Sequence, residues 1–498
     1  MDEIDLLSLA ESIARSCNLN DWDKAKQLLK KIITDESGLK NVSQGLFLQC
    51  MNEILKNLSE KINHSDDNIL QPVQECAAEC FRCLRQACAL NSQIQSGLSS
   101  FMDILENTKI ITEKIISVDA QKDSENVLKC AIQFLGNACV SNATNQKAIW
   151  ELFINQFRSF LHHADSKVCD YTCMLVHTCL TTVAKIDQCL LNNASAQDIV
   201  LTCIEATAQK DIEWGLYVLE DMLKNDLFLP KLYWKMGHKE RLLTMEVMLA
   251  EMIDLPEDCS GGQAELDPSQ LAISQANLSF IADDVKKECN LILKLKSPET
   301  TDQENGVSVV HCTNQSFVYN MHMALVIAKE LELLSIAAQH QTIYPSIQQD
   351  TELLVCAINL LRSINDIGKS GGNVFSREEK ASGVDSIDPH HPVYGLKKDL
   401  IRLIANMAYK HRANQDLVRS LDGIPLLLDL TMIDCHNPFI TQWVVLAIRN
   451  LVENNRENRD VLSGMSLQGM AGHIAALREA GIHTELRGGK IVVKPVDG

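Results

Sequence analysis

The sequence predicts an all-α protein, an armadillo/HEAT-like α-solenoid with a small C-terminal helix plus β-hairpin cap. Gly and Pro number only 22 and 11 among the 498 residues, and aromatic residues make up 5%, which is too few turn formers and rings for a large β-sandwich or barrel. Apolar residues recur at helical spacing along most of the chain. A motif anchored on Asn also returns after 44 residues, from Asn406 to Asn450, and an armadillo or HEAT unit is about 40 to 47 residues long.

The N-terminal half is expected to consist of helices of about 10 to 20 residues, because the breaks in its apolar pattern are short and polar. Residues 251–310 then carry twelve acidic and four basic side chains, which indicates two acidic loops around one helix near residues 269–296. These patterns predict six segments: N-terminal armadillo-like repeats in 1–255, acidic loops with one helix in 256–315, a helical repeat in 316–367, a flexible loop in 368–395, C-terminal armadillo-like repeats in 396–464, and a helix and β-hairpin cap in 465–498.

Three segments align without gaps on an Asn-to-Asn spacing of eight residues. Their anchors are Asn137 with Asn145, Asn406 with Asn414, and Asn450 with Asn458. Residues 81–88 resemble a degenerate copy of the same long helix. In residues 421–428, Gly423 and Pro425 fit a junction in which one helix ends at Gly and the next has Pro in its first turn.

The C-terminal tail has a different pattern. Residues 473–480 are expected to form a short helix, and residues 482–486 and 490–494 a β-hairpin around residues 487–489. A solenoid has to cover the open apolar face of its last repeat, so the tail is interpreted as a cap. A separate binding module remains the alternative.

The charge balance excludes one class of partner. The chain has 46 Lys and Arg against 65 Asp and Glu, a formal net charge of −19, whereas a nucleic-acid backbone binder needs a basic stripe. No stretch reaches the roughly 18 uninterrupted apolar residues that a membrane span requires. The first residues lack the basic and apolar regions of a secretory signal peptide, so the 18 Cys are expected to be reduced, in the cytosol or nucleus.

Two groups of thiols were weighed as metal sites. Cys76, Cys80 and Cys83, at i, i+4 and i+7, share one face of a predicted helix. Cys169, Cys173 and His177 have a similar arrangement at i, i+4 and i+8. Zinc needs four ligands around it, which one helix face does not supply, so packing is the favoured interpretation of both groups. There is no Gly-x-Ser-x-Gly or His-Glu-x-x-His motif. The sequence therefore predicts no enzyme, no catalytic or metal-binding residue and no cofactor.

The candidate binding surface is a stripe around each repeat Asn. Residues four and eight apart share a helix face, and polar groups on the inner helix of a solenoid line the groove in which such arrays bind extended peptides. The alternative is that each Asn hydrogen-bonds the backbone of a neighbouring loop. Nuclear-import armadillo proteins carry a Trp four residues before such an Asn, which is absent here, so a receptor for basic signals is disfavoured. The stripe comprises Gln133, Asn137, Ser141, Arg402, Asn406, Lys410, Leu446, Asn450 and Asn454.

Several of these segments resemble the ataxin-10 family. The resemblance is carried by residues 437–451 (NPFITQWVVLAIRNL), 421–425 (LDGIP), 400–406 (LIRLIAN), 79–85 (ECFRCLR), 134–137 (FLGN), 373–376 (NVFS) and the hairpin in 481–494. The C-terminal block is the most specific part. The acidic middle and the first 60 residues contain no motif of the family.

The resemblance implies an armadillo-like protein without enzymatic activity that self-associates as a homo-oligomer. It implies a location in the cytoplasm, including perinuclear regions, the centrosome or ciliary base, and the midbody. The implied roles are neuron survival, neurite outgrowth, cytokinesis and ciliary function. The implied partners are O-linked N-acetylglucosamine transferase, a heterotrimeric G-protein β subunit and a ciliary IQ-motif protein.

Residues and resemblance together predict a scaffold or adaptor that binds other proteins through its groove and its C-terminal repeats. A cargo or transport adaptor of the armadillo type is the alternative within the binding proteins. A thiol-dependent metal or redox enzyme is the alternative from another class.

Overall fold

A computed structural model describes most of the chain. The described residues are 3–64, 67–117, 122–180, 186–187, 190–191, 193–253, 255, 271–295, 310–378, 388–464, 484–487 and 490–493. The chain divides into two compact units, Met1–Leu227 (unit 1) and Phe228–Gly498 (unit 2). This division lies inside the segment 1–255, which the sequence pattern treats as one array.

Unit 1 consists of helices joined by short polar breaks. Its elements are α1 (Glu3–Asn18), α2 (Trp22–Thr34), α3 (Glu36–Asn41), α4 (Gln44–His64), α5 (Asp67–Leu90), α6 (Ser92–Gly97), the 3-10 helix η1 (Leu98–Ser100), α7 (Met102–Ser117), α8 (Lys122–Cys139), α9 (Ala143–Leu161), α10 (Ser166–Cys179), α12 (Ala194–Gln209) and α13 (Glu213–Leu223).

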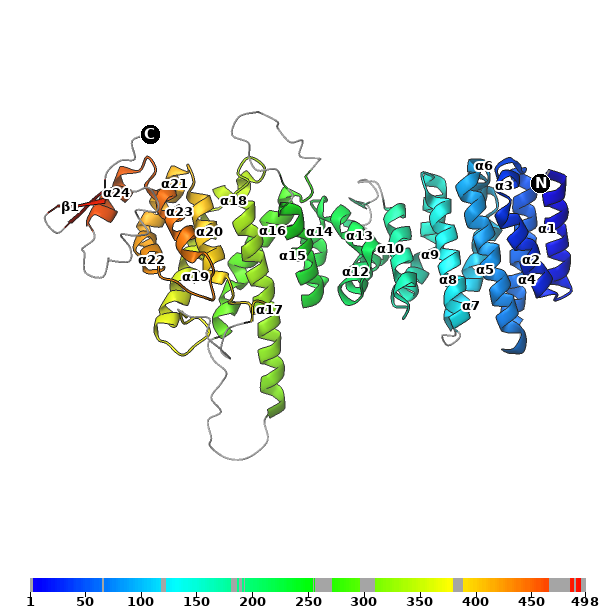
Figure 1. The fold of residues 1–498 in the computed structure, drawn as a ribbon, viewed down its shortest axis with the longest axis horizontal. Helices are drawn as coiled ribbons and strands as arrows, with labels where there is room; N and C mark the ends of the chain where they lie inside the picture. The colour runs from blue at the N-terminus through cyan, green and yellow to red at the C-terminus, as the bar shows by residue number, and fades with distance from the viewer. Residues whose placement is uncertain are drawn as a thin grey trace. The chain divides into compact units, whose positions relative to one another are not determined.

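The long helices of unit 1 stack in two layers (Figure 1). Helices α2, α5, α8, α10 and α13 pack against one another in this order, and α1, α4, α7, α9 and α12 form the other layer. Each helix of one layer also contacts a sequence neighbour in the other, as α4 does with α5. In a solenoid, each structural repeat packs against the repeats next to it. The helices of unit 1 pack in this way, so the predicted α-solenoid is confirmed.

Polar side chains in the breaks cap the N-termini of the helices that follow. The side chain of Asn142 accepts a hydrogen bond from the backbone N–H of Asn145 at 3.0 Å, at the start of α9. Asn193 does the same for Ala196 at 3.0 Å, at the start of α12. Such a capping side chain contributes about 1 kcal/mol by satisfying an N–H that has no partner within the helix.

The core of unit 1 lies between its helices and is apolar. The rings of Phe81 in α5 and Phe134 in α8 are stacked with centroids 6.2 Å apart, and both are fully buried. Helix α9 adds Phe153, Phe157 and Phe160, all 0% exposed. Residues 81–88, interpreted as a degenerate repeat helix, thus lie in α5, next to the repeat helix α8.

Unit 2 contains the remaining helices and a small sheet. Its elements are α14 (Phe228–Leu232), the 3-10 helix η2 (Tyr233–Lys235), α15 (His238–Ile253), α16 (Gln275–Glu288), the 3-10 helix η4 (Cys289–Leu295), α17 (Val310–Ala337), α18 (Pro345–Gln349), α19 (Thr351–Lys369), α20 (Leu396–Ala408), α21 (Arg412–Ser420), α22 (Gly423–Asp429), α23 (Ile440–Val452), α24 (Arg456–Gly464), β1 (Thr484–Arg487) and β2 (Lys490–Val493).

Unit 2 repeats the layered packing. Helices α15, α17, α20 and α23 contact one another in this order, while α16 and α19 pack beside them as a second layer. The helix expected near residues 269–296 corresponds to α16 followed by η4. The loop expected in 368–395 is anchored where it is described, because the Gly395 N–H donates to the His436 carbonyl at 2.8 Å and Phe375 is fully buried.

The junction between α21 and α22 differs from the expected one. Gly423 is the first residue of α22, and the left-handed residue before it is Asp422, with φ of 49°. A Cβ atom on Gly423 would lie 2.6 Å from Val418 Cγ1 and 2.9 Å from the Val418 carbonyl oxygen. Gly423 is therefore required because its backbone lies close to Val418 of α21, where a side chain would not fit. A positive φ angle is not the reason for glycine at this position.

The tail forms the expected hairpin. Strands β1 and β2 are antiparallel, with Thr484 opposite Val493 and Arg487 opposite Lys490. The expected helix at residues 473–480 and the turn residues Gly488 and Gly489 lie outside the described residues. Helix α24 contacts β2, so the hairpin lies against the last described helix of unit 2.

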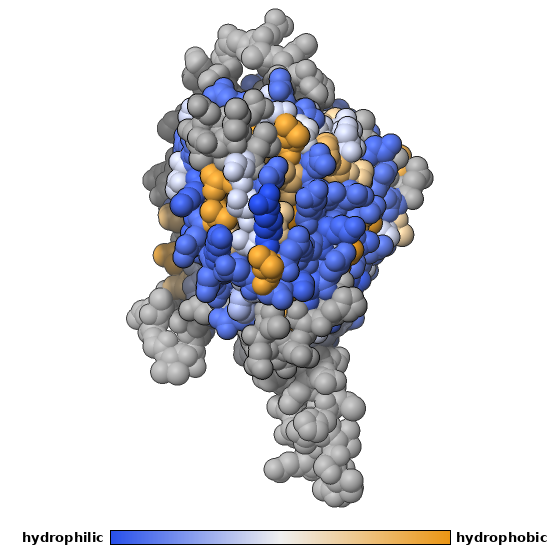
Figure 2. Space-filling model, turned by 90° about the vertical axis from the view of Figure 1, so that its right-hand side faces the viewer, coloured by the Kyte–Doolittle hydropathy of each residue, from blue (hydrophilic) through white to orange (hydrophobic). Residues whose placement is uncertain are grey.

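One face of the molecule shows how polar and apolar residues are distributed at the surface. The view in Figure 2 shows described residues that are mostly hydrophilic, with hydrophobic residues in small groups between them. In the described part of the chain, no helix combines the length and the apolar character needed to cross a membrane.

Candidate functional site

The first Asn of each repeat binds the backbone of the preceding repeat. The Nδ2 atom of Asn137 in α8 donates to the carbonyl oxygen of Arg85 in α5 at 3.1 Å. Asn406 in α20 donates in the same way to Ser335 in α17, and Asn450 in α23 to Ala405 in α20, both at 2.9 Å. The side chains of Asn406 and Asn450 are 8% and 4% exposed. Each Asn thus hydrogen-bonds backbone, as in the alternative interpretation, but the acceptors lie in the preceding repeat helices α5, α17 and α20 and not in the expected neighbouring loops.

The second Asn of each repeat bridges two repeats. Its Nδ2 atom donates both to the carbonyl seven residues earlier, at the end of its own repeat helix, and to a carbonyl of a short helix in the preceding repeat. All three side chains are 0% exposed. The pairs of acceptors are Ala138 (2.9 Å) and Gln95 (2.7 Å) for Asn145, Met407 and Gln348 (both 2.8 Å) for Asn414, and Leu451 (2.7 Å) and Gln415 (3.2 Å) for Asn458.

The six Asn side chains form what we call the asparagine ladder: Asn137, Asn145, Asn406, Asn414, Asn450 and Asn458. Each of these amides donates to backbone carbonyl groups of neighbouring helices, some of which lie at helix ends. Gln415 strengthens the connection, since its Nε2 atom donates to the Asn450 carbonyl at 2.9 Å. The Asn-to-Asn spacing of eight thus has a structural cause, which is the coupling of successive repeats.

The third residue of each predicted stripe is not on the helix face, so that part of the interpretation is wrong. Ser141, Lys410 and Asn454 follow the ends of α8, α20 and α23, with φ of 54°, 50° and 54°. A left-handed residue ends the helix and reverses the direction of the side chain. All three side chains are exposed, and they mark equivalent turns in three repeats.

The remaining stripe residues lie at the surface beside the asparagine ladder. The side chain of Gln133 accepts a hydrogen bond from the guanidinium of Arg85. Arg402 donates to Gln339 Oε1 at 3.1 Å, and its Cζ atom lies 4.9 Å from the centroid of the Trp443 ring. Leu446 is half-buried on α23. Trp443 thus provides an aromatic contact for Arg402 from the next repeat, which the sequence reasoning did not identify.

The electrostatics near Arg402 are set by burial. Burial raises the pKa of Asp399 to about 6, although the neighbouring Lys398, at 3.1 Å, acts in the opposite direction. Burial also lowers the pKa of Arg402. An acid with a folded-state pKa near 6 is only partly ionised just below neutral pH, so the charge of the buried Asp399 beside Arg402 depends on pH.

Two of the predicted residues line one pocket. Lys410 and Asn454, from the equivalent turns after α20 and α23, border a pocket of about 460 Å3 together with Arg412, Gln415 and Glu453. Arg412 is held in place because its Nη1 atom donates to the Asn454 carbonyl at 3.1 Å. We call this the turn pocket. Its exposed ammonium and carboxylate side chains suit a polar segment of another protein.

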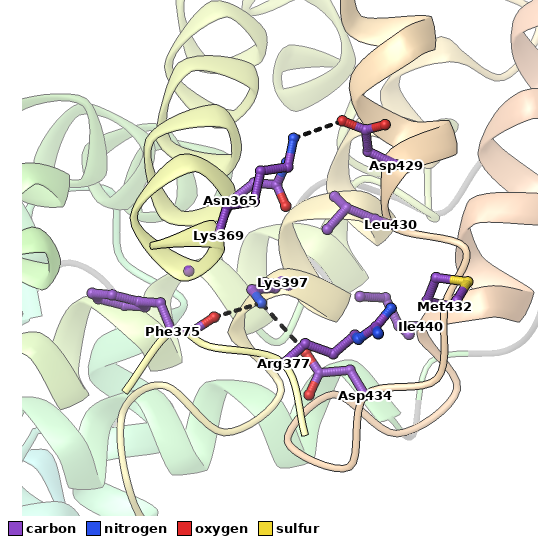
Figure 3. Close-up of a pocket in the computed structure, with 11 residues that line it drawn as sticks. Asn365, Lys369, Phe375, Arg377, Lys397, Asp429, Leu430, Met432, Asp434 and Ile440 are labelled. Carbon is purple, nitrogen blue, oxygen red and sulfur yellow. Dashed lines mark hydrogen bonds and ion pairs between the residues drawn. The ribbon is translucent and has the colours of Figure 1, made fainter. Parts of the chain in front are cut away.

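A second pocket, of about 260 Å3, surrounds a buried ion pair (Figure 3). The Nζ atom of Lys397 lies 3.4 Å from Asp434 Oδ2 and donates to the Phe375 carbonyl at 2.8 Å. The side chains of Lys397 and Asp434 are 5% and 3% exposed. Nearer the mouth of the pocket, Lys369 pairs with Asp429 at 2.8 Å, and both of these side chains are about half exposed.

The same network joins segments that carry the family resemblance. The Asn437 side chain accepts hydrogen bonds from the backbone N–H groups of Lys397 and Lys398, at 2.9 and 3.2 Å, and so begins α20. It also donates to Asp434 at 2.9 Å. Residues 373–376 and 437–451 therefore meet at Lys397, near the start of the helix α20 that also contains residues 400–406. The motifs of these segments did not predict the ion pair between Lys397 and Asp434.

The two groups weighed as metal sites have other contacts. Cys80 and Cys83 are fully buried, and burial raises the pKa of Cys83 to about 12, so these thiols stay protonated. Cys169 Sγ lies 3.1 Å from the Leu161 carbonyl, whereas His177 pairs with Asp221 at 3.1 Å and lowers its pKa to about 2. Among the described residues, no group of three His, Cys, Asp or Glu side chains is arranged to hold a metal ion.

Comparison with solved structures gives weak similarity. The crystal structure of SYS-1 matches with a TM-score of 0.34 and 11% identity, covering 91% of this chain and 65% of that one. An engineered protein matches with a TM-score of 0.31 and 13% identity, covering 91% and 100%. At these scores the similarity adds nothing to the fold described above.

Comparison with known sequences is far more informative. A family model described as the spinocerebellar ataxia type 10 protein domain matches residues 396–494. Ataxin-10 of Bos taurus is 32% identical over 426 residues, covering 84% of this chain and 81% of the relative. Ataxin-10 of Xenopus tropicalis is 30% identical over 491 residues, covering 96% of this chain and 93% of the relative. The similarity extends over nearly the whole of both chains, and this chain therefore belongs to the ataxin-10 family.

Proposed function

We propose that the chain is a non-enzymatic scaffold that binds other proteins at the turn pocket and the adjoining surface of α20 and α23. The observation that supports this proposal is that some residues of the predicted stripe are buried between repeats while others are exposed at the surface. The side chains of Asn406 and Asn450 form hydrogen bonds between repeats. Lys410 and Asn454 lie just after the ends of α20 and α23, and their side chains are exposed. The exposed side chains are thus available to a partner without any change in the fold.

The partners implied by the ataxin-10 resemblance are part of this proposal. They are O-linked N-acetylglucosamine transferase, a heterotrimeric G-protein β subunit and a ciliary IQ-motif protein. The proposed roles are neuron survival, neurite outgrowth, cytokinesis and ciliary function, and the proposed location is the cytoplasm, including the perinuclear region, the centrosome or ciliary base, and the midbody. Membership of the family supports these assignments.

The double variant Lys410→Asn/Asn454→Gly tests the turn pocket. Asn and Gly both accept the left-handed backbone, so the variant removes an ammonium group and an amide without straining the turns. We expect the affinity for a purified partner of the three proposed kinds to fall by about tenfold. We expect the melting temperature to change by no more than about 2 °C. Titration by calorimetry and thermal melts measure the two effects.

A matched control is available in unit 1. Ser141→Gly alters the equivalent left-handed turn after α8 and should leave both affinity and melting unchanged. If the double variant binds every partner of the wild type with unaltered affinity, the turn pocket is not the binding site. If the variant loses affinity only together with stability, these residues are structural.

We further propose that unit 2 carries the self-association surface. Three large apolar side chains within eight residues are exposed in the segment between α22 and α23: Met432 at 43%, Ile433 at 71% and Phe439 at 72%. Phe439 also has a left-handed backbone, with φ of 63°. Bulky residues rarely adopt this conformation, so the fold holds this ring toward water at a cost. A second copy of the chain, carrying the same apolar segment, is the proposed occupant.

The variant Ile433→Ser/Phe439→Asn tests this surface. Asn tolerates the left-handed backbone, so the fold should persist while the apolar contact is lost. Sedimentation velocity over a range of concentrations is expected to show the wild type associating and the variant remaining monomeric. Tyr319→Ser, which removes another exposed ring on α17, is the control. Equal association of the wild type and the double variant would disprove the assignment.

A further inference from the structure

Two thiols of unit 2 lie against each other, away from the asparagine ladder and the turn pocket. Cys289 is the first residue of η4, and Cys356 lies in α19. Their Sγ atoms are 3.2 Å apart, although 67 positions separate them in the sequence. Both are free cysteines. A disulfide bond is about 2.05 Å long, so a movement of the sulfur atoms of roughly 1.2 Å would bring them to bonding distance.

This pair is open to small molecules. Cys289 is 5% exposed and Cys356 is half-buried. Both side chains line a surface pocket of about 370 Å3, whose other lining residues include Lys286 and Asn290. A peroxide molecule is far smaller than this pocket. Solvent therefore reaches the pair through this pocket.

The two sulfur atoms differ in chemical character. The hydrogen bond between the two thiols, in which either sulfur could be the donor, lowers the pKa of Cys289 and raises the pKa of Cys356. The thiolate is the form that attacks an oxidant. The 3.2 Å contact places either sulfur to attack the oxidised product of the other, and the direction of the pKa shifts favours Cys289 as the thiol that is oxidised first. The nearby Lys286 ammonium is neutralised by Asp350 at 2.7 Å and Asp283 at 2.9 Å.

We propose that Cys289 and Cys356 are a modification site, a dithiol that hydrogen peroxide converts reversibly into an intramolecular disulfide. The Cys289 thiolate attacks the O–O bond, an S–O bond forms, and the released hydroxide takes a proton to leave as water. The Cys356 sulfur then attacks the sulfenic sulfur, the S–O bond breaks, and the hydroxyl group leaves as a second water with the Cys356 proton. Two thiols and one peroxide give one disulfide and two waters, and the two sulfurs lose two electrons.

The chain contains a matched pair for comparison. The Sγ atoms of Cys139 and Cys179, in unit 1, are 3.8 Å apart. These side chains are 0% and 3% exposed. Proximity is therefore similar in the two pairs, whereas access from solvent differs. If access and a half-buried resolving thiol matter, only the Cys289 and Cys356 pair should respond to peroxide.

Treatment of the folded full-length protein with hydrogen peroxide tests the proposal without any mutation. After the remaining thiols are blocked with N-ethylmaleimide, mass spectrometry of peptides under non-reducing conditions should show a cross-link between Cys289 and Cys356. We expect it to form at least about tenfold faster than a link between Cys139 and Cys179. Dithiothreitol should remove the cross-link completely.

Two variants assign the roles of the sulfur atoms. Cys356→Ser keeps a hydrogen-bond donor beside Cys289 but removes the resolving sulfur, so dimedone should trap a sulfenic acid at Cys289. Cys289→Ser should leave Cys356 largely unmodified. The proposal is overturned if the wild-type pair stays reduced while other thiols oxidise, or if Cys139 and Cys179 cross-link as fast. It is also overturned if Cys289 is found linked only to another molecule.

Discussion

Asp434→Ala is expected to lower the free energy of unfolding of unit 2 by about 3 to 5 kcal/mol, because it leaves the Lys397 ammonium in the core without its counter-ion. The Lys397 and Asp434 side chains are 5% and 3% exposed, and their charged atoms are 3.4 Å apart. Asp434 also accepts a hydrogen bond from the Asn437 side chain at 2.9 Å. Removal of this carboxylate therefore loosens the segment before α23 as well as α20.

The pH dependence of this loss identifies its cause. Burial lowers the pKa of Lys397 below its ordinary value of 10.5, and loss of Asp434 should lower it further. The penalty for a buried ammonium is present in full below the folded-state pKa and disappears as the pH rises above the unfolded-state pKa. The variant should therefore be less destabilised at pH 9.5 than at pH 7.

Native-state hydrogen exchange of amides in α20 and α23 measures the effect in unit 2 separately from unit 1. Asp429→Ala is the matched control, because it breaks the pair with Lys369, whose two side chains are 57% and 48% exposed. An exposed pair contributes at most about 1 kcal/mol. Equal losses for the two variants would show that the Lys397 pair is not buried as described.

Asn414→Ala is expected to lower the free energy of unfolding by about 2 to 4 kcal/mol, since it leaves one buried and one partly buried carbonyl group without this donor. Asn414 donates to Gln348 and Met407, both at 2.8 Å, and its side chain is 0% exposed. One acceptor belongs to α18 and the other to α20. Loss of this side chain should therefore weaken the contact between successive repeats as well as the end of α20.

Urea unfolding followed by circular dichroism measures this loss, and hydrogen exchange locates it. Exchange should accelerate in α18, α20 and α21 and remain unchanged in unit 1. Asn359→Ala, at an exposed position of α19, is the control and should be neutral or slightly stabilising because Ala favours helix. A neutral Asn414→Ala variant would contradict a structural role for the asparagine ladder.

Much of the fold could be predicted from the sequence because its signals are local. Apolar spacing revealed the helices, and the spacing of eight between Asn406 and Asn414 marked a unit of the array. What this spacing could not reveal was the direction of the side chains. The left-handed conformation of Lys410 depends on where α20 ends, and helix ends are the least certain part of a pattern.

The contacts missed by the sequence reasoning are all between distant residues. Lys397 and Asp434 are 37 positions apart, and Cys289 and Cys356 are 67 apart. Neither pair has a periodic signal, because each depends on how neighbouring helices pack. A buried Lys in an apolar helix face, such as Lys397 in α20, was the one clue available. A buried ammonium group needs an acidic partner, but the sequence alone could not identify that partner as Asp434.

The central claim is that the asparagine ladder holds the repeats together while the exposed turn residues beside it bind other proteins. Hydrogen exchange of the full chain, with and without one of the proposed partners bound, tests this claim most directly. We expect binding to slow exchange in residues 409–412 and 453–457, which include four of the five residues that line the turn pocket. Slowing confined to β1 and β2 would contradict it, since the hairpin would then be the recognition module and the repeats only its support.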